Sequence, residues 1–161
     1  MKAAVLTISD KGYAKTREDT SGPLLCEMLG RIDASVECYD IVPDERRAII
    51  DKLLNYADER KLDIVLTTGG TGVSPRDITP DATKDVIDRE IPGMAEAMRM
   101  ESFKITPHAV ISRAMAGIRG TTLIINLPGS PKAAKENLET ILKAIPHTVA
   151  KMQGDPADCA T

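Results

Sequence analysis

Residues 66–83 read LTTGGTGVSPRDITPDAT. A short apolar run leads into three glycines within four positions, a charged loop follows, and Thr79-Pro80 has the form of a helix start. Glycines let the backbone approach a ligand closely and present N–H groups to it. The stretch therefore predicts a strand, a phosphate-binding turn and a helix, with Arg76, Asp77 and Asp81 as charged groups of the site.

The glycine turn matches neither of the standard nucleotide-binding spacings. A Walker loop would require Gly-Lys followed by Ser or Thr near residues 74–76, and the dinucleotide pattern would require a small residue where Pro75 stands. A plain strand-to-loop turn is therefore the alternative interpretation of residues 69–72.

Outside this stretch, strand and helix patterns alternate. Apolar runs at 3–8, 36–42, 62–67 and 122–127 predict four strands, of which 36–42 is the most broken and belongs nearer an edge. Ile50, Leu53, Leu54 and Ala57 have the spacing of an amphipathic helix of about 16 residues. We expect one α/β domain over residues 1–161, a three-layer αβα sandwich with a mainly parallel sheet. Residues 92–119 give no clear pattern apart from helical spacing at 94–103.

Each predicted strand is followed by a polar loop, at 9–11, 43–45, 69–72 and 128–132. Ligands bind beyond the carboxyl ends of strands in open α/β sheets, so the four loops are expected to converge on one rim. Structural interpretations compete at several positions. Asp44 suits the N-cap of a helix that begins at Glu45, Ser130 suits the N-cap before Pro131, and Asp81 suits the first turn of a helix. Asp77, Arg76 and Lys132 could equally be solvated surface groups.

Composition excludes some functions. The 161 residues carry a formal net charge of −3 and only 2% aromatic residues, which argues against nucleic-acid or anionic-membrane binding. Cys26, Cys38 and Cys159 form no CxxC pair, and His108 and His147 lack zinc-ligand spacing. The first apolar run is too short for a signal peptide, so we expect a cytoplasmic protein. Gly, Pro and Asp near the end predict a mobile tail at about 150–161.

Seven motifs resemble the MogA/MoaB family of molybdenum-cofactor biosynthesis proteins, which is related to the G domain of gephyrin. They read TISD (7–10), DTSG (19–22), VPDE (42–45), the opening stretch, DREIPG (88–93), SRA (112–114) and NLPGSPK (126–132). MoaB-like members often lack the carboxylate of VPDE and the RDxTPD loop. Both are present here, so the chain resembles the MogA side of the family.

The resemblance implies a trimeric molybdopterin adenylyltransferase. Such an enzyme uses Mg-ATP to attach AMP to the terminal phosphate of molybdopterin, releases pyrophosphate and hands its product to a molybdate-insertion protein. Asp44 and Asp77 match the family's two essential carboxylates, and their binding of Mg²⁺ is a hypothesis. The remaining candidate binding residues are Ser9, Asp10, Gly69, Gly70, Thr71, Gly72, Arg76, Asp81, Ser112, Pro128, Gly129, Ser130 and Lys132.

Two other functions stay open at this point. The first is a non-catalytic, MoaB-like molybdopterin-binding or scaffold protein that keeps the pocket without turnover. The second is another step of the kind performed by multidomain relatives, against which the short length argues. The sequence also leaves open whether a molybdenum or a tungsten cofactor is served.

Overall fold

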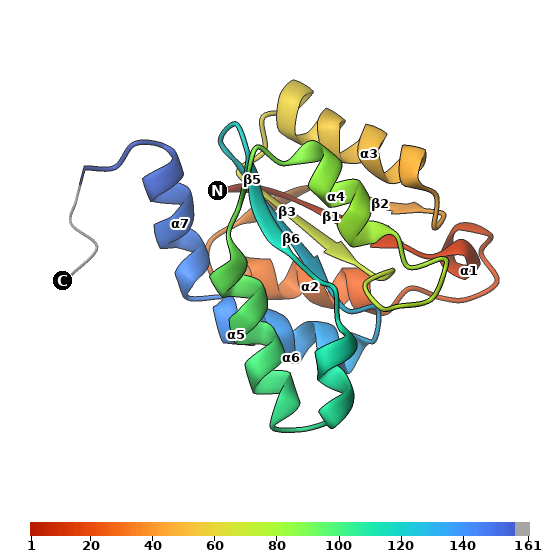
Figure 1. Ribbon diagram of the computed structural model, residues 1–161. Helices are drawn as coiled ribbons and strands as arrows, with labels where there is room; N and C mark the ends of the chain where they lie inside the picture. Colours follow the sequence, from red (N-terminus) through yellow and green to blue (C-terminus); the bar gives the residue numbers. More distant parts are fainter. Residues whose placement is uncertain (157–161) are drawn as a thin grey trace.

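A six-stranded sheet forms the centre of the protein in the computed structural model, which describes residues 1–156 (Figure 1). The strand order is β2-β1-β3-β6-β5-β4. The strands are β1 (Lys2–Ile8), β2 (Ser35–Val42), β3 (Ile64–Thr68), β4 (Arg89–Glu90), β5 (Ala116–Arg119) and β6 (Thr122–Leu127). The first four in this order run parallel, β5 pairs antiparallel with β6, and β4 pairs antiparallel with β5. The mainly parallel sheet and the edge position of β2 are thus as predicted.

Helices cover both faces of the sheet, which gives the three layers expected from the sequence (Figure 1). One face carries α2 (Ser21–Gly30), α5 (Pro92–Phe103), α6 (Pro131–Ile141) and α7 (Ala144–Met152), and the other carries α3 (Arg46–Leu54) and α4 (Thr79–Val86). Strand residues alternate between the two cores: Val5 and Leu66 pack with the first set of helices, and Leu6 and Val65 with the second. Because both faces are buried, the strands are almost continuously apolar.

Two strands, the helices α2 and α7 and three short helices were not predicted individually from the sequence. β4 has two residues, and β5 has four residues that include Gly117, so neither shows a recognisable period. The short helices are α1 (Asp10–Tyr13), the π-helix η1 (Asn55–Glu59) and the 3-10 helix η2 (Pro107–Ile111). The unclear region 92–119 thus consists of α5, η2 and β5.

The buried face of α3 differs from the predicted one. Ile49 and Leu53 are fully buried, whereas Ile50 and Leu54 are only partly buried. The chain continues from α3 directly into η1, where Tyr56 and Ala57 are buried. The buried residues Ile49, Leu53, Tyr56 and Ala57 still follow helical spacing at i, i+4, i+7 and i+8, so the predicted apolar stripe was displaced by about one residue from the observed one.

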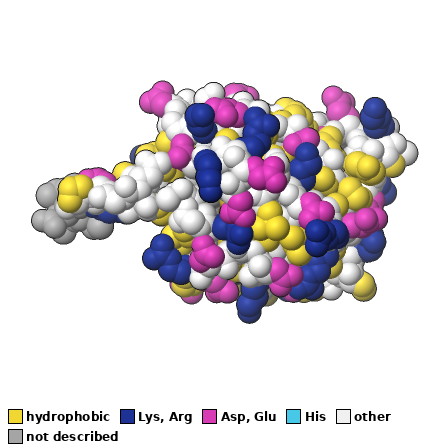
Figure 2. Space-filling view, turned by 90° about the horizontal axis from the view of Figure 1, so that it is seen from above, with side chains coloured by type: hydrophobic (Ala, Val, Ile, Leu, Met, Phe, Trp, Pro, Cys, Tyr) yellow, Lys and Arg dark blue, Asp and Glu magenta, His cyan; other side chains and the backbone are white. Residues whose placement is uncertain are grey.

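The last helix of the described chain is α7. Residues 150–152 of the predicted mobile tail belong to α7, and residues 157–161, with Cys159, lie outside the described part of the chain. Across residues 1–156, the helices lack the length and apolar content needed to cross a membrane. The surface over α3 and α4 shows intermingled acidic and basic side chains (Figure 2). The ion pairs Arg46–Asp85 and Arg47–Asp51 belong to these helices.

Candidate active site

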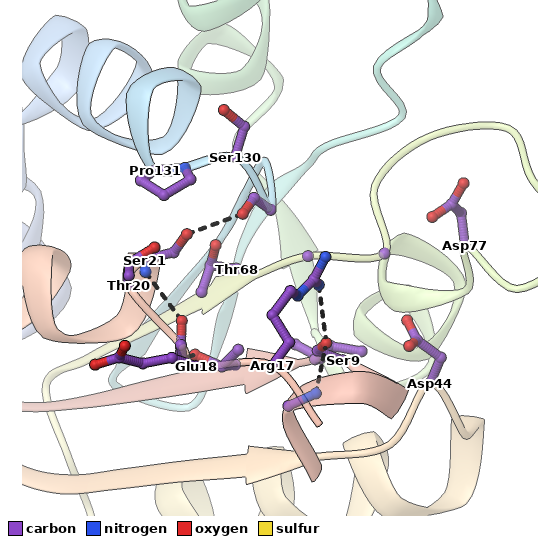
Figure 3. Close-up of a pocket in the computed structure, with 17 residues that line it drawn as sticks. Ser9, Arg17, Glu18, Thr20, Ser21, Asp44, Thr68, Asp77, Ser130 and Pro131 are labelled. Atoms are coloured by element: carbon purple, nitrogen blue, oxygen red, sulfur yellow. Dashed lines mark hydrogen bonds between the residues drawn. The ribbon is translucent and has the colours of Figure 1, made fainter. Parts of the chain in front are cut away.

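A cavity of about 510 Å³ opens at the carboxyl ends of β1, β3 and β6 (Figure 3). After β1 the chain crosses to β2 at the edge, and after β3 it continues toward β6 on the other side. The loops that leave these two neighbouring strands diverge and leave a crevice between them. The residues that line it are Thr7, Ile8, Ser9, Gly12, Arg17, Glu18, Asp19, Thr20, Ser21, Asp44, Thr68, Gly69, Gly70, Asp77, Gly129, Ser130 and Pro131.

The turn after β3 requires glycine at two consecutive positions. Gly69 and Gly70 have φ angles of +104° and +63°, a region that side-chain-bearing residues rarely adopt. A Cβ at Gly69 would collide with the carbonyl oxygen of Ile8, and one at Gly70 with the hydroxyl of Thr79. The same hydroxyl donates to the carbonyl of Gly69 at 2.9 Å. The glycines therefore serve the close approach of β1, β3 and α4 at the floor of the cavity.

Asp44 lies at the end of β2 and points toward the cavity (Figure 3). Glu45, and not Asp44, occupies the N-cap position of α3, so the capping interpretation is wrong. The Asp44 carboxylate instead accepts from the backbone N–H of Asp10 at 2.9 Å, and the Asp10 carboxylate accepts from the N–H of Asp44 at 3.0 Å. This reciprocal pair joins the loops after β1 and β2.

Burial raises the pKa of the Asp44 carboxyl above its ordinary value, because the charged form loses solvation. The N–H of Asp10 and the charge of Arg76 act in the opposite direction, and the negative charges of Asp10 and Asp77 add to the rise. A cation that reached this point would relieve the crowding of carboxylates.

Asp77 reaches the cavity from the loop between β3 and α4, beside Asp44 (Figure 3). Its carboxylate accepts from the backbone N–H of Ser74 at 2.8 Å, and its own N–H donates to the Ser74 carbonyl at 2.9 Å. The side chain is thus held by a local turn, with its second carboxylate oxygen directed away from that bond. Asp77 is the second carboxylate expected from the sequence to act on substrate, and it shares the cavity with Asp44.

Arg76 and Asp10 form an ion pair at the cavity's rim, with 2.6 Å between the guanidinium and the carboxylate. Its hydrogen bond with Arg76 lowers the pKa of the Asp10 carboxyl. Both side chains are exposed, and neither is part of the lining. The pair bridges the loops after β1 and β3 on the side where Asp44 lies.

Other predicted residues are distributed around this cavity. Ser9 lines it and accepts from Arg17 at 3.2 Å, and Gly129 and Ser130 line its opposite side. Ser130 occupies the N-cap position of α6 as expected, but its hydroxyl makes no capping bond and is free to face the cavity. Lys132 points away, 3.9 Å from Glu136.

A second, smaller cavity of about 240 Å³ lies on the other side of the glycine turn, between α5, η2 and α6. Thr71, Gly72, Ser112 and Pro128 line it, so these predicted residues surround a neighbouring space and not the first cavity. The surface that faces this space is mostly apolar, although many of the residues that line it are polar, among them Arg99, Ser102 and His108. Asp81 lines neither cavity; it lies in the first turn of α4, as expected, and pairs with Arg113 at 3.0 Å.

Residues 4–147 match the family model described as "Probable molybdopterin binding domain". The chain belongs to this family. It is 46% identical over 153 residues to the molybdopterin adenylyltransferase of Helicobacter pylori strain J99, covering 94% of this chain and 87% of that protein. It is 45% identical over 146 residues to the molybdenum cofactor synthesis protein cinnamon of Drosophila melanogaster, covering 90% of this chain but only 24% of that longer protein.

Solved structures of this family have the same fold. The molybdopterin biosynthesis enzyme MoaB from Thermus thermophilus superimposes with a TM-score of 0.90 at 46% identity and covers 98% of this chain and 99% of its own. The tungsten cofactor synthesizing protein MoaB from Pyrococcus furiosus superimposes with a TM-score of 0.86 at 38% identity, covering 94% of this chain and 96% of its own. The family resemblance and the three-layer fold drawn from the sequence are therefore confirmed.

Sequence reasoning did not nominate the segment before α2, although the motif DTSG (19–22) lies there. Asp19 accepts from the N–H groups of Ser21 and Gly22 and from the hydroxyls of Thr7 and Tyr39. Burial raises the pKa of the Asp19 carboxyl, but these donors outweigh it and the net pKa is below the ordinary value. Ser21 donates to the carbonyl of Gly129 at 2.8 Å. An Asp two residues before a helical Ser was the available signal.

The residues that line the first cavity fit a metal ion that is bound partly by the protein and partly by a substrate. Across residues 1–156, no group of three or more His, Cys, Asp or Glu side chains is arranged to hold a metal by itself. Mg²⁺ is commonly bound by one or two carboxylates together with substrate phosphates. Asp44 and Asp77 lie at one end of the cavity, where the charge of Asp77 contributes to the raised pKa of Asp44, and the two carboxylates fit this kind of site.

Proposed function

We propose that this protein is a molybdopterin adenylyltransferase, which transfers AMP from Mg-ATP to the terminal phosphate of molybdopterin and releases pyrophosphate. The observation that carries the proposal is the meeting of Asp44 and Asp77 at one end of a cavity otherwise built from the Gly69–Gly70 turn and the start of α6. The name of the Helicobacter pylori relative, at 46% identity, supports the same activity.

The reaction joins two phosphate groups. An oxygen of the molybdopterin phosphate attacks the α-phosphorus of ATP, the bond from that phosphorus to the bridging oxygen breaks, and pyrophosphate leaves with the electron pair. The attacking oxygen is already deprotonated at neutral pH, so the step needs no general base. Catalysis of such a transfer consists mainly of positioning and of stabilising negative charge.

The charge of the cavity explains why a divalent cation is needed. Among the described residues, the lining includes four carboxylates, those of Glu18, Asp19, Asp44 and Asp77, against the single guanidinium of Arg17. A triphosphate would be repelled by this surface unless a cation came with it. Asp44 and Asp77 would hold Mg²⁺, which spreads the charge that develops on the phosphate oxygens.

Neutral donors would bind the phosphates on the opposite side of the cavity. The N-terminus of α6, at residues 129–131, and the turn at Gly69–Gly70 both face the space, and N–H groups at a helix start favour anions. Arg17 is held toward the cavity by its bond to Ser9. We assign the nucleotide to this first cavity.

The second cavity supplies the place for the other substrate. It borders the glycine turn and the 128–129 segment from the other side: Gly69, Gly70 and Gly129 line the first cavity, and Thr71, Gly72 and Pro128 line the second. The mostly apolar surface of the second cavity suits a flat heterocycle, with Ser102 and Ser112 as hydrogen-bonding groups. Molybdopterin bound there would direct its phosphate across Gly70 toward Asp77.

Pyrophosphate release from purified protein, Mg-ATP and molybdopterin tests the proposal. We expect release that depends on Mg²⁺ and falls about 100-fold or more in Asp77→Asn, because a charge-stabilising group is lost. The matched control is Asp51→Asn, an exposed carboxylate on α3 that is paired with Arg47. Binding of molybdopterin without any release would contradict the proposal and support the scaffold alternative.

We also propose that the protein assembles as a homotrimer in the cytoplasm. Met100, Phe103 and Val110 on α5 and η2 are 67%, 55% and 65% exposed and line one apolar groove. An apolar surface of this kind is typical of a contact between subunits.

The thiols of Cys26 and Cys38 are free, which fits a reducing compartment. A molybdate-insertion protein is the partner that would receive the adenylylated product.

A further inference from the structure

The guanidinium of Arg113 binds both ends of the loop that carries Asp77. Its Nε donates to the carbonyl of Gly72 at 2.8 Å, and a terminal nitrogen donates to the carbonyl of Asp77 itself. The terminal nitrogens also bind the two carboxylate oxygens of Asp81 at 3.2 and 3.0 Å. The backbone N–H of Arg113 donates to the carbonyl of Thr71 at 2.8 Å. One residue thus contacts four positions between 71 and 81.

The loop between these contacts has little other support. Val73, Ser74, Pro75 and Arg76 are exposed, and the bonds between Ser74 and Asp77 are internal to the loop. The pair of Arg76 with Asp10 is formed by two exposed side chains, a kind of contact that contributes little. The bond from Arg113 to the Asp77 carbonyl therefore ties the backbone of the carboxylate residue to the segment between η2 and β5.

We infer that Arg113 is a positioning residue, which fixes the point at which the Asp77 carboxylate enters the cavity. The inference rests on the proposed adenylyl transfer and adds a residue that touches neither cavity. A displacement of about 1 Å in a catalytic group can reduce a rate about 100-fold, so a brace on the Asp77 backbone has a direct kinetic consequence. Nucleotide binding, which depends on the Gly69–Gly70 turn and α6, is expected to change less.

The geometry requires arginine at this position. Only a guanidinium has enough donors, in a fixed plane, to bind two carbonyls and one carboxylate at once. A lysine at 113 would keep the charge beside Asp81 but would lose the simultaneous bonds to Gly72 and Asp77. Arg113→Lys therefore separates the role of the positive charge from that of the several hydrogen bonds made by the guanidinium.

Arg119 is a matched control for these variants. It binds the Asp58 carboxylate through Nε at 2.8 Å and the carbonyl of Val86 at 2.8 Å, a similar combination of a carboxylate and a backbone carbonyl. It stands on β5 opposite Thr122, the first residue of β6, and so lies at the end of the sheet remote from the cavity. Arg119→Ala removes a comparable network without touching the loop of Asp77.

The experiment measures hydrogen exchange of residues 72–78 and the kinetics of pyrophosphate release in the wild type, Arg113→Ala, Arg113→Lys and Arg119→Ala. We expect faster exchange of this segment in both Arg113 variants only. We also expect a fall in kcat of about 100-fold with KM for ATP within about threefold, and partial recovery of Arg113→Ala by added guanidinium ion. Unfolding curves identify any variant that fails to fold, in which case Arg113→Lys carries the comparison.

Exchange in residues 72–78 that stays at the wild-type rate, or kcat that stays near the wild-type value, would overturn the inference. An equal loss in Arg119→Ala would also overturn it, because the effect would then come from general destabilisation. If the wild type itself released no pyrophosphate, the proposed function would fail, whereas the exchange measurement would still decide whether Arg113 holds the loop.

Discussion

At Asp44, burial and a backbone hydrogen bond act in opposite directions on the same carboxyl group. Burial raises its pKa, the N–H of Asp10 and the charge of Arg76 lower it, and the carboxylates of Asp10 and Asp77 raise it again. The net effect raises the pKa of Asp44, so the charged form of this carboxyl group destabilises the folded protein. A site that gives up stability to hold a charge is typical of a functional position.

The sign of this shift predicts how Asp44→Asn changes stability with pH. A folded pKa above the unfolded value, here an ordinary 3.8, gives a stabilising contribution below that pH that is lost as the pH rises through the folded pKa. The free energy of unfolding of the wild type relative to Asp44→Asn should therefore fall between pH 4 and 7, by about 1 kcal/mol or less because solvent screens a partly exposed group.

Denaturant unfolding of both proteins across this range measures the difference, in which titrations elsewhere in the molecule cancel. Asn keeps an oxygen that can accept from Asp10, so the variant should fold and still lose pyrophosphate release. A difference that grows in favour of the wild type as the pH rises would contradict the assigned environment of Asp44.

A comparison of Gly70 and Gly120 separates two costs of adding a side chain: the cost of the left-handed backbone and the cost of a collision with neighbouring atoms. Their φ angles are +63° and +55°, but a Cβ at Gly70 would collide with Thr79 whereas one at Gly120 would meet no atom within 4 Å. Gly120→Ala should cost about 1–2 kcal/mol for the left-handed backbone alone. Gly70→Ala should cost more and should also weaken ATP binding.

Thermal unfolding and ATP titration of the two alanine variants make this comparison. Equal losses of stability, together with unchanged ATP affinity in Gly70→Ala, would show that the turn is only a connection between β3 and α4. That result would restore the plain-turn interpretation that the sequence left open.

At the scale of the elements, packing against the sheet decides which face of α3 is buried. Helical spacing selected Ile50, Leu53, Leu54 and Ala57, and the structure buries Ile49, Leu53, Tyr56 and Ala57 more completely. The side chain of Tyr56 donates to Asp40 at 2.5 Å, so this part of the helix is anchored to β2. Periodicity located the helix and two of its four core residues, because both sets of residues have helical spacing and only the tertiary packing decides between the two overlapping faces.

Leu53→Ala and Leu54→Ala form a matched pair on this helix. Leu53 is 0% exposed, so its truncation should lower the free energy of unfolding by about 2–5 kcal/mol. Leu54 is partly buried, and its truncation should cost no more than about 1.5 kcal/mol. Urea unfolding of the two variants measures both values; a larger loss for Leu54→Ala would restore the face predicted from the sequence.

At the scale of the whole molecule, the apolar groove on α5 and η2 is the feature that a single subunit leaves uncovered. Arg99 lines both this groove and the second cavity, and it donates to the carbonyl of Ala114 at 2.8 Å. A subunit that covered Phe103 and Val110 would thus lie close to the proposed molybdopterin cavity.

Phe103→Glu should therefore convert a trimer into monomers, because it places a charge in an apolar contact. Sedimentation equilibrium or light scattering gives the mass of the wild type and the variant. Tyr13→Glu is the matched control, since Tyr13 is a 60% exposed aromatic residue on α1, away from this groove. A wild type that is monomeric at micromolar concentration, or a trimer that survives Phe103→Glu, would count against this interface.

Local chemistry in the sequence determined the family, the fold class and the loops that form the candidate site. Continuous apolar runs require a sheet buried on both faces, and the polar residues after each run lie at its carboxyl end. The sequence therefore predicted the cavity's rim and its residues Ser9, Asp44, Gly69 and Asp77. β4 and β5 were not predicted: β4 has only two residues and pairs with β5, which is distant in the chain, and β5 has four residues that show no recognisable strand period.

Only the tertiary structure decided what each polar residue contacts. Asp44 bonds Asp10, 34 positions away, and not its own helix, and Arg113 reaches Asp77 across 36 positions. Ser112 and Thr71 come to line a second cavity, and Lys132 turns toward its own helix. Local patterns constrain the nearest few residues, whereas a site is assembled from loops whose separation in space is set by the packing of the whole sheet.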